Sequence, residues 1–293
     1  MVEINEKSRG RNRVEYIGKI FNSTIELRNY LDNTPADKTW EKEKLMATHE
    51  KRYSKSDFKE CFGVESIQEA QDYLVYGWED GFEQCVNKIK KGNEKNEIKH
   101  NTFKNDVYGF CPNVPAAIMG LPQSMINIER QNKEVQKRKI IHIVYDNVVS
   151  WNISNRTLLD NAKKMVSVIS MLEKSGYRVE LYSIFSGIYY DVDGEKNKKV
   201  IQFGGLKIKD SSQQLNLKKI MYPLSHPSWC RVTGFMYEEK SRFYEDGRGS
   251  VLMEENYQNK IASFFDKKGV YFNTQELIKL NTRNILDKLG VMI

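Results

Sequence analysis

The clearest hydrophobic pattern lies in the middle of the chain, where two apolar runs flank an amphipathic segment. Ile140 to Asp146 is an almost unbroken β-branched run closed by an acid, which is typical of a strand buried on both faces. From Asn155, the expected N-cap, apolar positions recur at helical spacing, and Gly176 falls where a left-handed C-cap belongs. Residues 179–184 predict a second strand. The order strand, helix, strand predicts an α/β domain, whose functional residues gather at the carboxyl ends of strands.

The pattern before this block is polar and mainly helical. Residues 1–60 are polar and highly charged. Ser23 or Thr24 is the expected cap of a short helix over 25–31 that ends before Pro35, and residues 38–59 predict exposed helix or loop. The strongest helix of this part spans 66–89 and opens with a Ser-x-x-Glu capping box. Gly77 and Gly81 lie within it, and because glycine weakens a helix interior, we interpret them as points of tight packing.

Composition divides the chain into three parts. Residues 90–104 are rich in Lys and Asn and nearly free of large apolar side chains, which indicates a linker or mobile loop. We therefore predict a mainly helical N-terminal region over 1–95, a linker over 96–108 and an α/β domain over 109–293.

The pattern within 109–293 also predicts shorter elements. The prolines and small residues of 111–125 predict a tightly packed corner, and Met125, Ile126 and Ile128 predict a helix after it. The remaining predictions are a turn at 193–194, a strand over 200–208 with a bulge or bend at 204–205, a helix over 215–222, a helix over 261–265, a strand over 270–272 and a final helix over 277–289.

Composition and charge narrow the class of protein. The chain has 293 residues, 40% hydrophobic and 29% charged, with a net charge of +7. No apolar run approaches the ~20 residues of a membrane helix, and no apolar segment follows the basic residues near the start, so we expect no membrane contact and a cytoplasmic location. Cys61, Cys85, Cys111 and Cys230 are too scattered for a zinc site and predict reduced thiols. The positive charge argues against a DNA mimic.

The end of the first predicted strand is a candidate metal site. Asp146 and Ser150 match the first and third positions of the Asp-x-Ser-x-Ser motif with which von Willebrand A-type domains hold a divalent cation. Val148 replaces the middle serine, and valine cannot coordinate through its side chain. We therefore expect no metal here, and Asp146 to cap a turn instead.

The other candidates for chemistry have less support in the residues. A nucleophile pair of Cys230 with His226 lacks a third partner, and His142, inside an apolar strand, reads as a core histidine. The sequence lacks the glycine-rich phosphate-binding motifs of nucleotide enzymes. Lysine-rich runs over 88–104, 131–139 and 196–199 have little aromatic interleaving, so we expect solvated faces rather than direct nucleic-acid contact. We predict no catalytic residue and no cofactor.

Four stretches together resemble a family of tailed-phage proteins that contain a von Willebrand A-like domain. These stretches are Gly-Trp-Glu-Asp-Gly at 77–81, Pro-Ala-Ala-Ile-Met-Gly-Leu-Pro-Gln-Ser-Met at 115–125, the strand–helix–strand block at 140–184 and Val-Tyr-Phe-Asn-Thr-Gln-Glu-Leu-Ile at 270–278. The resemblance covers roughly residues 66–290. It implies a von Willebrand A-like, Rossmann-type sheet with helices on both faces.

The length and the Lys/Asn-rich style also resemble phage inhibitors of the bacterial Gabija defence system. This resemblance implies a homo-oligomeric, non-enzymatic protein of the host cytoplasm that binds the Gabija nuclease–helicase complex and blocks its access to DNA. It carries over no contact residues, so the partner-binding residues stay open. The alternatives are a von Willebrand A-like partner-binding or chaperone module in phage replication or assembly, and a DNA-binding accessory protein.

Overall fold

The chain divides into two compact units in the computed structural model. Unit 1 comprises Met1–Lys91 and Ile140–Ile293, and unit 2 comprises Gly92–Lys139. The structure describes residues 1–7, 14–38, 40–91, 102–109, 111–129, 139–149, 153–190, 199–241 and 251–291. The predicted linker at 96–108 thus overlaps the start of unit 2, and the α/β unit draws on both ends of the chain.

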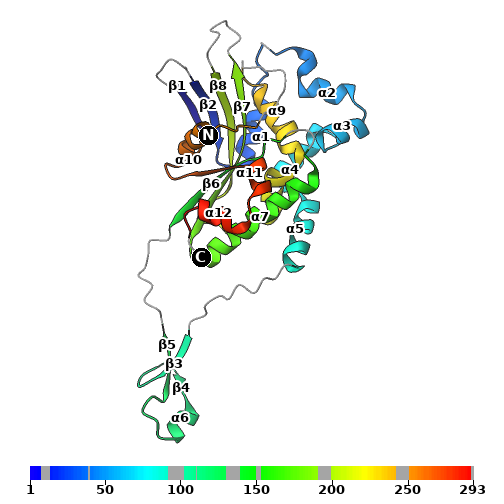
Figure 1. The fold of residues 1–293 in the computed structure, drawn as a ribbon. Coiled ribbons are helices and arrows are strands. Elements are labelled where there is room, and N and C mark those ends of the chain that lie inside the picture. Colours follow the sequence, from blue (N-terminus) through cyan, green and yellow to red (C-terminus); the bar gives the residue numbers. More distant parts are fainter. Residues whose placement is uncertain are drawn as a thin grey trace. The chain divides into compact units, whose positions relative to one another are not determined.

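The described part of unit 1 is built on a mixed six-stranded sheet of order β1-β2-β8-β7-β6-β9 (Figure 1). Its strands are β1 (Val2–Lys7), β2 (Val14–Phe21), β6 (Ile140–Asp146), β7 (Arg178–Tyr190), β8 (Lys199–Lys209) and β9 (Val270–Asn273). The strands β7, β6 and β9 run parallel, β8 is antiparallel to β7, β2 is parallel to β8, and β1 is antiparallel to β2. The predicted α/β class is confirmed.

Helices cover the sheet. They are α1 (Thr24–Asn33), η1 (Lys42–Lys44), α2 (Met46–Arg52), α3 (Lys55–Phe62), α4 (Ile67–Tyr76), α5 (Glu79–Lys91), α7 (Asn155–Lys174), α8 (Leu217–Ser225), the π-helical η2 (Trp229–Gly234), α9 (Phe235–Glu238), α10 (Glu255–Phe265), α11 (Thr274–Lys279) and α12 (Thr282–Lys288). On one face Ile141, Ile143 and Tyr145 of β6 pack with α7, α8, α11 and α12. On the other face Val144 packs with Ile261 of α10. No helix in the described residues has both the length and the apolar character of a membrane span.

The central strand–helix–strand block forms as predicted, with one shift. The N-cap of α7 is Ser154, whose hydroxyl accepts a hydrogen bond from the amide of Thr157, rather than Asn155. Gly176 follows the helix with a φ of +88°, the left-handed conformation that glycine adopts at no steric cost. The local hydrophobic pattern therefore predicts this block correctly, except that the N-cap lies one residue earlier.

The N-terminal region differs from the prediction because it supplies two strands to the sheet. The sequence predicts a mainly helical region over 1–95, but β2 lies between β1 and β8 and is mostly buried. Two charged residues obscured its pattern. Glu15 is buried beside Lys7 of β1, and Lys19 pairs with Glu3 of β1. Pairing across β1 thus compensates charges that made β2 look exposed.

The helix predicted over 66–89 is two helices. Ser66 caps α4 as predicted by accepting from the amide of Glu69, but Gly77 has a φ of +89° and ends it. A Cβ atom at Gly77 would lie 2.6 Å from the carbonyl oxygen of Lys218, so the backbones of the two segments meet at this point. The final predicted helix is also divided, because Asn281 caps a new helix, α12, after α11.

The paired glycines at 204–205 lie within an uninterrupted ladder, not at a bulge. β8 pairs in register through both, and the irregularity lies between Leu181 and Tyr182 of β7. A Cβ atom at Gly204 would lie 2.2 Å from the ring of Phe185, so the missing side chain makes room for an aromatic ring. The turn predicted at 193–194 lies outside the described residues.

The described part of unit 2 is a small three-stranded sheet of order β3-β5-β4 with one short helix (Figure 1). Its elements are β3 (Thr102–Asp106), β4 (Cys111–Pro112), α6 (Val114–Ile118) and β5 (Met125–Glu129). Pro115 lies in the first turn of α6 and Gly120 has a φ of +69°, as expected for a short helix and a turn, but the corner is not tightly packed, because Ile118 and Met119 are exposed. The helix predicted from Met125 is wrong. This segment is a strand, because β3 and β4 offer it partners on both sides.

Candidate functional site

The carboxyl ends of β6 and β9 meet at Asp146, as the α/β pattern predicts, whereas β7 continues past this point to Tyr190. Asp146 is the last residue of β6, in register with Ile184 of β7 and Asn273 of β9. Its side chain is fully buried. The acid that the sequence offers as a cation ligand is therefore a buried side chain and does not line an open crevice.

Protein donors occupy both oxygens of the Asp146 carboxylate. The hydroxyls of Ser186, from β7, and Tyr271, from β9, donate to Oδ2. The backbone amide of Val148 donates to Oδ1 at 3.1 Å. The predicted role as a turn cap is confirmed by this last contact. The two hydroxyls add a function that the sequence did not reveal, since they tie β6 to both neighbouring strands.

The buried carboxylate is costly to ionise. Burial raises the pKa of Asp146 to about 6, and the hydrogen bonds from Ser186 and Tyr271 oppose part of that rise. Burial and the nearby carboxylate also raise the pKa of Tyr271, so its hydroxyl remains a donor. The arrangement stabilises one internal negative charge through neutral donors.

Of the two residues that match the ion-binding motif, Asp146 lies within the described residues and Ser150 does not. Val148 is buried. Within the described ranges no group of three or more His, Cys, Asp or Glu side chains could hold a metal ion.

A second layer of polar contacts surrounds this strand end. Tyr145 and Thr274 share a hydrogen bond of 3.1 Å, and Thr274 Oγ1 also donates to the carbonyl of Asp146 at 3.3 Å. Asn161 of α7 donates to the carbonyl of Thr274 at 3.0 Å. Buried polar groups need such partners, and here the partners link β6, α7 and α11.

The carbonyl of Pro223 shows why the network extends to α8. A helix would satisfy this carbonyl with the amide four residues later, but that residue is Pro227, which has no N–H. Ser183 of β7 donates to the orphan carbonyl at 2.7 Å and Asn147 donates at 3.3 Å. Two prolines in α8 and its continuation thus require polar donors at the end of the sheet.

The histidine and cysteine weighed as a nucleophile pair have other surroundings. His226 is buried, and its Nδ1 lies 2.7 Å from Ser228 Oγ. Burial lowers the pKa of His226 to about 3 and raises the pKa of Cys230 to about 12. A thiol that stays protonated is a poor nucleophile, and both side chains are closed to a substrate.

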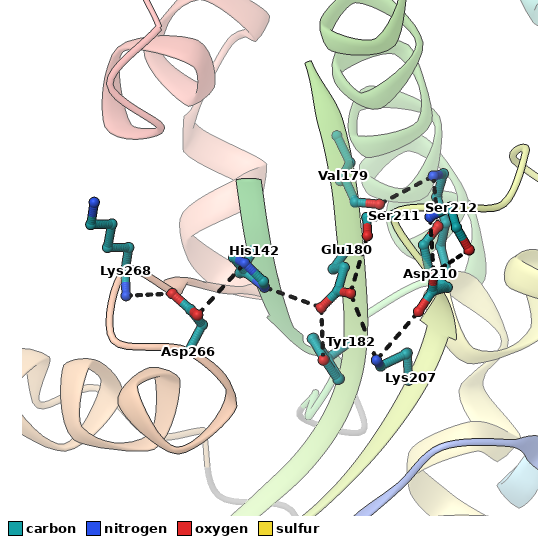
Figure 2. Close-up of polar contacts among 11 residues, drawn as sticks. His142, Val179, Glu180, Tyr182, Lys207, Asp210, Ser211, Ser212, Asp266 and Lys268 are labelled. Carbon is teal, nitrogen blue, oxygen red and sulfur yellow. Dashed lines mark hydrogen bonds and ion pairs between the residues drawn. The ribbon is translucent and has the colours of Figure 1, made fainter. Parts of the chain in front are cut away.

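A charged cluster lies at the opposite, amino ends of β6 and β7 (Figure 2). His142 lies between two carboxylates, with Nδ1 3.2 Å from Glu180 Oε2 and Nε2 3.6 Å from Asp266 Oδ2. Sequence reasoning treated His142 as a core histidine. Its partners are far away in the sequence, so no local signal marked the cluster.

Glu180 is the centre of this charged cluster. It accepts a hydrogen bond from Tyr182 at 3.0 Å and another from Ser211 at 3.3 Å, and it lies 3.7 Å from Lys207 Nζ (Figure 2). Burial, followed by the charge of Glu180, raises the pKa of Tyr182. Lys207 also pairs with Asp210 at 3.5 Å. Lys207 is thus the lysine of this cluster that lies near two carboxylates, those of Glu180 and Asp210.

The arrangement around His142 resembles an acid–base centre in composition but not in geometry. A general base needs one ring nitrogen free for the substrate while a carboxylate orients the other. In His142 both nitrogens face carboxylates, of Glu180 and Asp266. The cluster instead connects β6, β7 and the turn after α10.

The lysine-rich runs are the remaining candidates from the sequence. The lysine-rich runs at 88–104, 131–139 and 196–199 lie largely outside the described residues. At the edge of the last run, Lys199 pairs with Glu254 at 3.0 Å.

Comparison with known proteins gives one match. The model of a family described as a domain of unknown function, DUF7192, matches residues 9–292. The search of curated proteins and the search of solved structures each returned no match.

Proposed function

This chain belongs to the DUF7192 family, and we propose that it is a non-enzymatic, phage-encoded inhibitor of the bacterial Gabija defence system. It binds the Gabija nuclease–helicase complex and sterically blocks recognition and cleavage of DNA. The sequence resemblance to phage Gabija inhibitors supplies the partner. The buried carboxylate at the end of β6 supports the proposed mode of action, which is steric blocking through an outer surface.

The observation that carries the proposal is the sealed carboxylate of Asp146. In an ion-dependent binding domain, this acid holds a cation that a partner completes. Here the hydroxyls of Ser186 and Tyr271 and the amide of Val148 donate to the carboxylate oxygens that a cation would contact, and the side chain is fully buried. A strand end closed in this way acts as scaffold, which supports binding through an outer surface.

A von Willebrand A-like arrangement is part of the same proposal. Three features support it: the parallel order of β7, β6 and β9, the acid at the end of β6, and the long helix α7 that follows β6. The antiparallel β8 and the two N-terminal strands extend this core.

The test of the proposed function is reconstitution with the purified Gabija complex. We expect a stable complex on a sizing column and loss of DNA cleavage at a saturating ratio of this protein. Asp146→Asn keeps both properties, because the acid is scaffold. Elution of the two components apart at micromolar concentrations, with cleavage unchanged, would refute the proposal.

Two alternatives predict different outcomes. A von Willebrand A-like partner-binding or chaperone module, favoured by the position of Asp146, predicts thermal stabilisation by Mg²⁺ that Asp146→Asn removes. A DNA-binding accessory protein, favoured by the net charge of +7, predicts DNA affinity that falls steeply with salt. A melting-temperature series with Mg²⁺ and an anisotropy titration at two salt concentrations distinguish them.

A further inference from the structure

The ring of His142 faces an acid on each side (Figure 2). Its Nδ1 lies 3.2 Å from Oε2 of Glu180, and its Nε2 lies 3.6 Å from Oδ2 of Asp266. The exposed fractions of the His142 and Glu180 side chains are 17% and 14%, so water and salt screen this contact less than they screen a surface ion pair. Glu180 belongs to β7 and Asp266 to the turn after α10. We call these three side chains the histidine clamp.

Other contacts orient both carboxylates of the clamp. Oδ1 of Asp266 accepts from the backbone amide of Lys268 at 2.8 Å, while Oδ2 faces the ring. Oε1 of Glu180 accepts from Ser211 at 3.3 Å, and Oε2 accepts from Tyr182 at 3.0 Å. These donors are an amide and two hydroxyls, and they do not depend on the histidine. The charge of the ring therefore decides how strongly the clamp holds.

The geometry favours a ring that carries two protons. A carboxylate oxygen can only accept a hydrogen bond, and a neutral imidazole has one N–H and one lone pair. One nitrogen of a neutral His142 would therefore present its lone pair to an acid. An imidazolium presents an N–H to each acid and places a positive charge between two negative ones. Nδ1 is buried and makes no hydrogen bond of ordinary geometry with the described residues, so its attraction to Glu180 is ionic and needs that charge.

Charged groups on the adjoining elements leave this preference in place. Lys207 of β8 lies 3.7 Å from Oε1 of Glu180, which is not the oxygen that faces the ring. Lys207 also lies 3.5 Å from Asp210, so it reduces the negative charge of Glu180 only in part. Further charged side chains on these elements are Lys139 before β6, Arg178 of β7, Lys260 of α10, and Lys267 and Lys268 of the turn.

The clamp lies where the chain enters β9, the last strand of the described sheet. Asp266 ends α10, and its amide donates to the carbonyl of Ala262 at 3.2 Å. The amide of Gly269 closes the turn by donating to the carbonyl of Asp266 at 2.9 Å. β9 follows with four residues, which pair with β6. A short strand at the edge of a sheet has few ladder hydrogen bonds, so a contact at its entrance bears on how readily it opens.

We infer that His142 is a proton-operated clamp, which holds the turn 266–269 and the start of β9 against β6 and β7. A ring with two protons is held by both acids. A ring that loses one proton loses one of these contacts, and the entrance to β9 opens more readily. Histidine side chains change charge between about pH 5 and 8, so the clamp holds on the acid side of this range and loosens on the basic side. This device does not depend on the proposed inhibitor function.

Hydrogen exchange of the purified protein at pH 6 and pH 8 measures the clamp. The readout is the protection of the amides in 266–273, corrected for the intrinsic effect of pH on exchange. Between the two pH values, this protection should fall on the order of 5-fold more in the wild type than in His142→Gln, as expected for partly exposed ion pairs. Burial raises the pKa of Asp146 to about 6, so it titrates nearby, but both proteins share it and the comparison removes it.

The variant Asp266→Asn changes an acid of the clamp and keeps the ring. Its carboxamide oxygen can accept from Lys268, and its NH₂ can donate to a neutral ring. The fall in protection between pH 6 and pH 8 should therefore shrink to that of His142→Gln. The control is His49→Gln, which removes a histidine of α2 whose ring packs against Phe62, and it should behave as the wild type does.

Nuclear magnetic resonance of protein labelled with ¹⁵N at histidine reports the protons on the ring directly. The His142 resonances are those missing from His142→Gln, and at pH 6 both nitrogens should carry a proton. A neutral ring at pH 6 would overturn the inference. An equal fall in protection in the wild type, His142→Gln and Asp266→Asn would do the same. Loss of protection across all of unit 1, rather than in 266–273, would show that the histidine supports the whole fold and not the turn.

Discussion

The charge state of Asp146 can be tested by the variant Asp146→Asn. Asparagine has the same shape, and its amide oxygen can accept from Val148 while its NH₂ donates to the hydroxyls of Ser186 and Tyr271, which rotate to accept. Burial raises the pKa of the native carboxyl from 3.8 to about 6. A shift of about two units corresponds to about 3 kcal/mol, an upper value for the destabilisation caused by ionising this buried group.

The sign of the pH dependence follows from the raised pKa. Between pH 3.8 and about 6 the folded state holds the proton of Asp146 more tightly than the unfolded state does. The wild type therefore has its full contribution from this group below pH 3.8 and loses it as pH rises through about 6. The free energy of unfolding of Asp146→Asn, relative to the wild type, should rise by up to about 3 kcal/mol over that window.

Urea unfolding at a series of pH values measures this difference, because subtraction removes the titration of groups that the two proteins share. A difference that stays flat or falls with rising pH would refute the reasoning, since it would mean that the folded protein favours the charged form. A cation bound beside Asp146 would have that effect. Repeating the series with a chelator identifies this cause.

Three further changes test other contacts. Tyr271→Phe removes a donor to the charged carboxylate of Asp146 and should lower the free energy of unfolding by about 2 kcal/mol at pH 7, less at low pH, by urea titration. Lys209→Met removes a buried ammonium group that contacts three backbone carbonyls and Glu173. It should therefore lower the free energy of unfolding by about 3 kcal/mol in the same urea titration. Gly77→Ala should lower the free energy of unfolding by about 1–3 kcal/mol, and by more than Gly120→Ala does. Both glycines have a positive φ, but only at position 77 would the added Cβ meet a backbone carbonyl. Thermal melts of the two variants measure the difference.

Local sequence signals predicted the centre of the fold well. The strands β6 and β9, the helix α7 and the cap at Ser66 each depend on spacing or on one capping residue, and such signals are complete within a short window. The strand β2 was missed because Glu15 and Lys19 are compensated by residues of β1, which no local window contains. The segment from Met125 was read as a helix for a related reason, since its strand partners decide its conformation.

In the candidate site, too, the sequence predicts where Asp146 lies but not which groups contact it. The rule for strand ends placed Asp146 correctly, because its position depends on the run that precedes it. Its state depends on Ser186 and Tyr271, which lie 40 and 125 residues further along the chain. An acid at this point of a sheet can be satisfied by a cation, by neutral donors or by both, because each carboxylate oxygen has two lone pairs. Val148 offers no side-chain oxygen at the middle position of the motif, and the hydroxyls of Ser186 and Tyr271 donate to the carboxylate. This is why sealing the carboxylate also joins the three parallel strands.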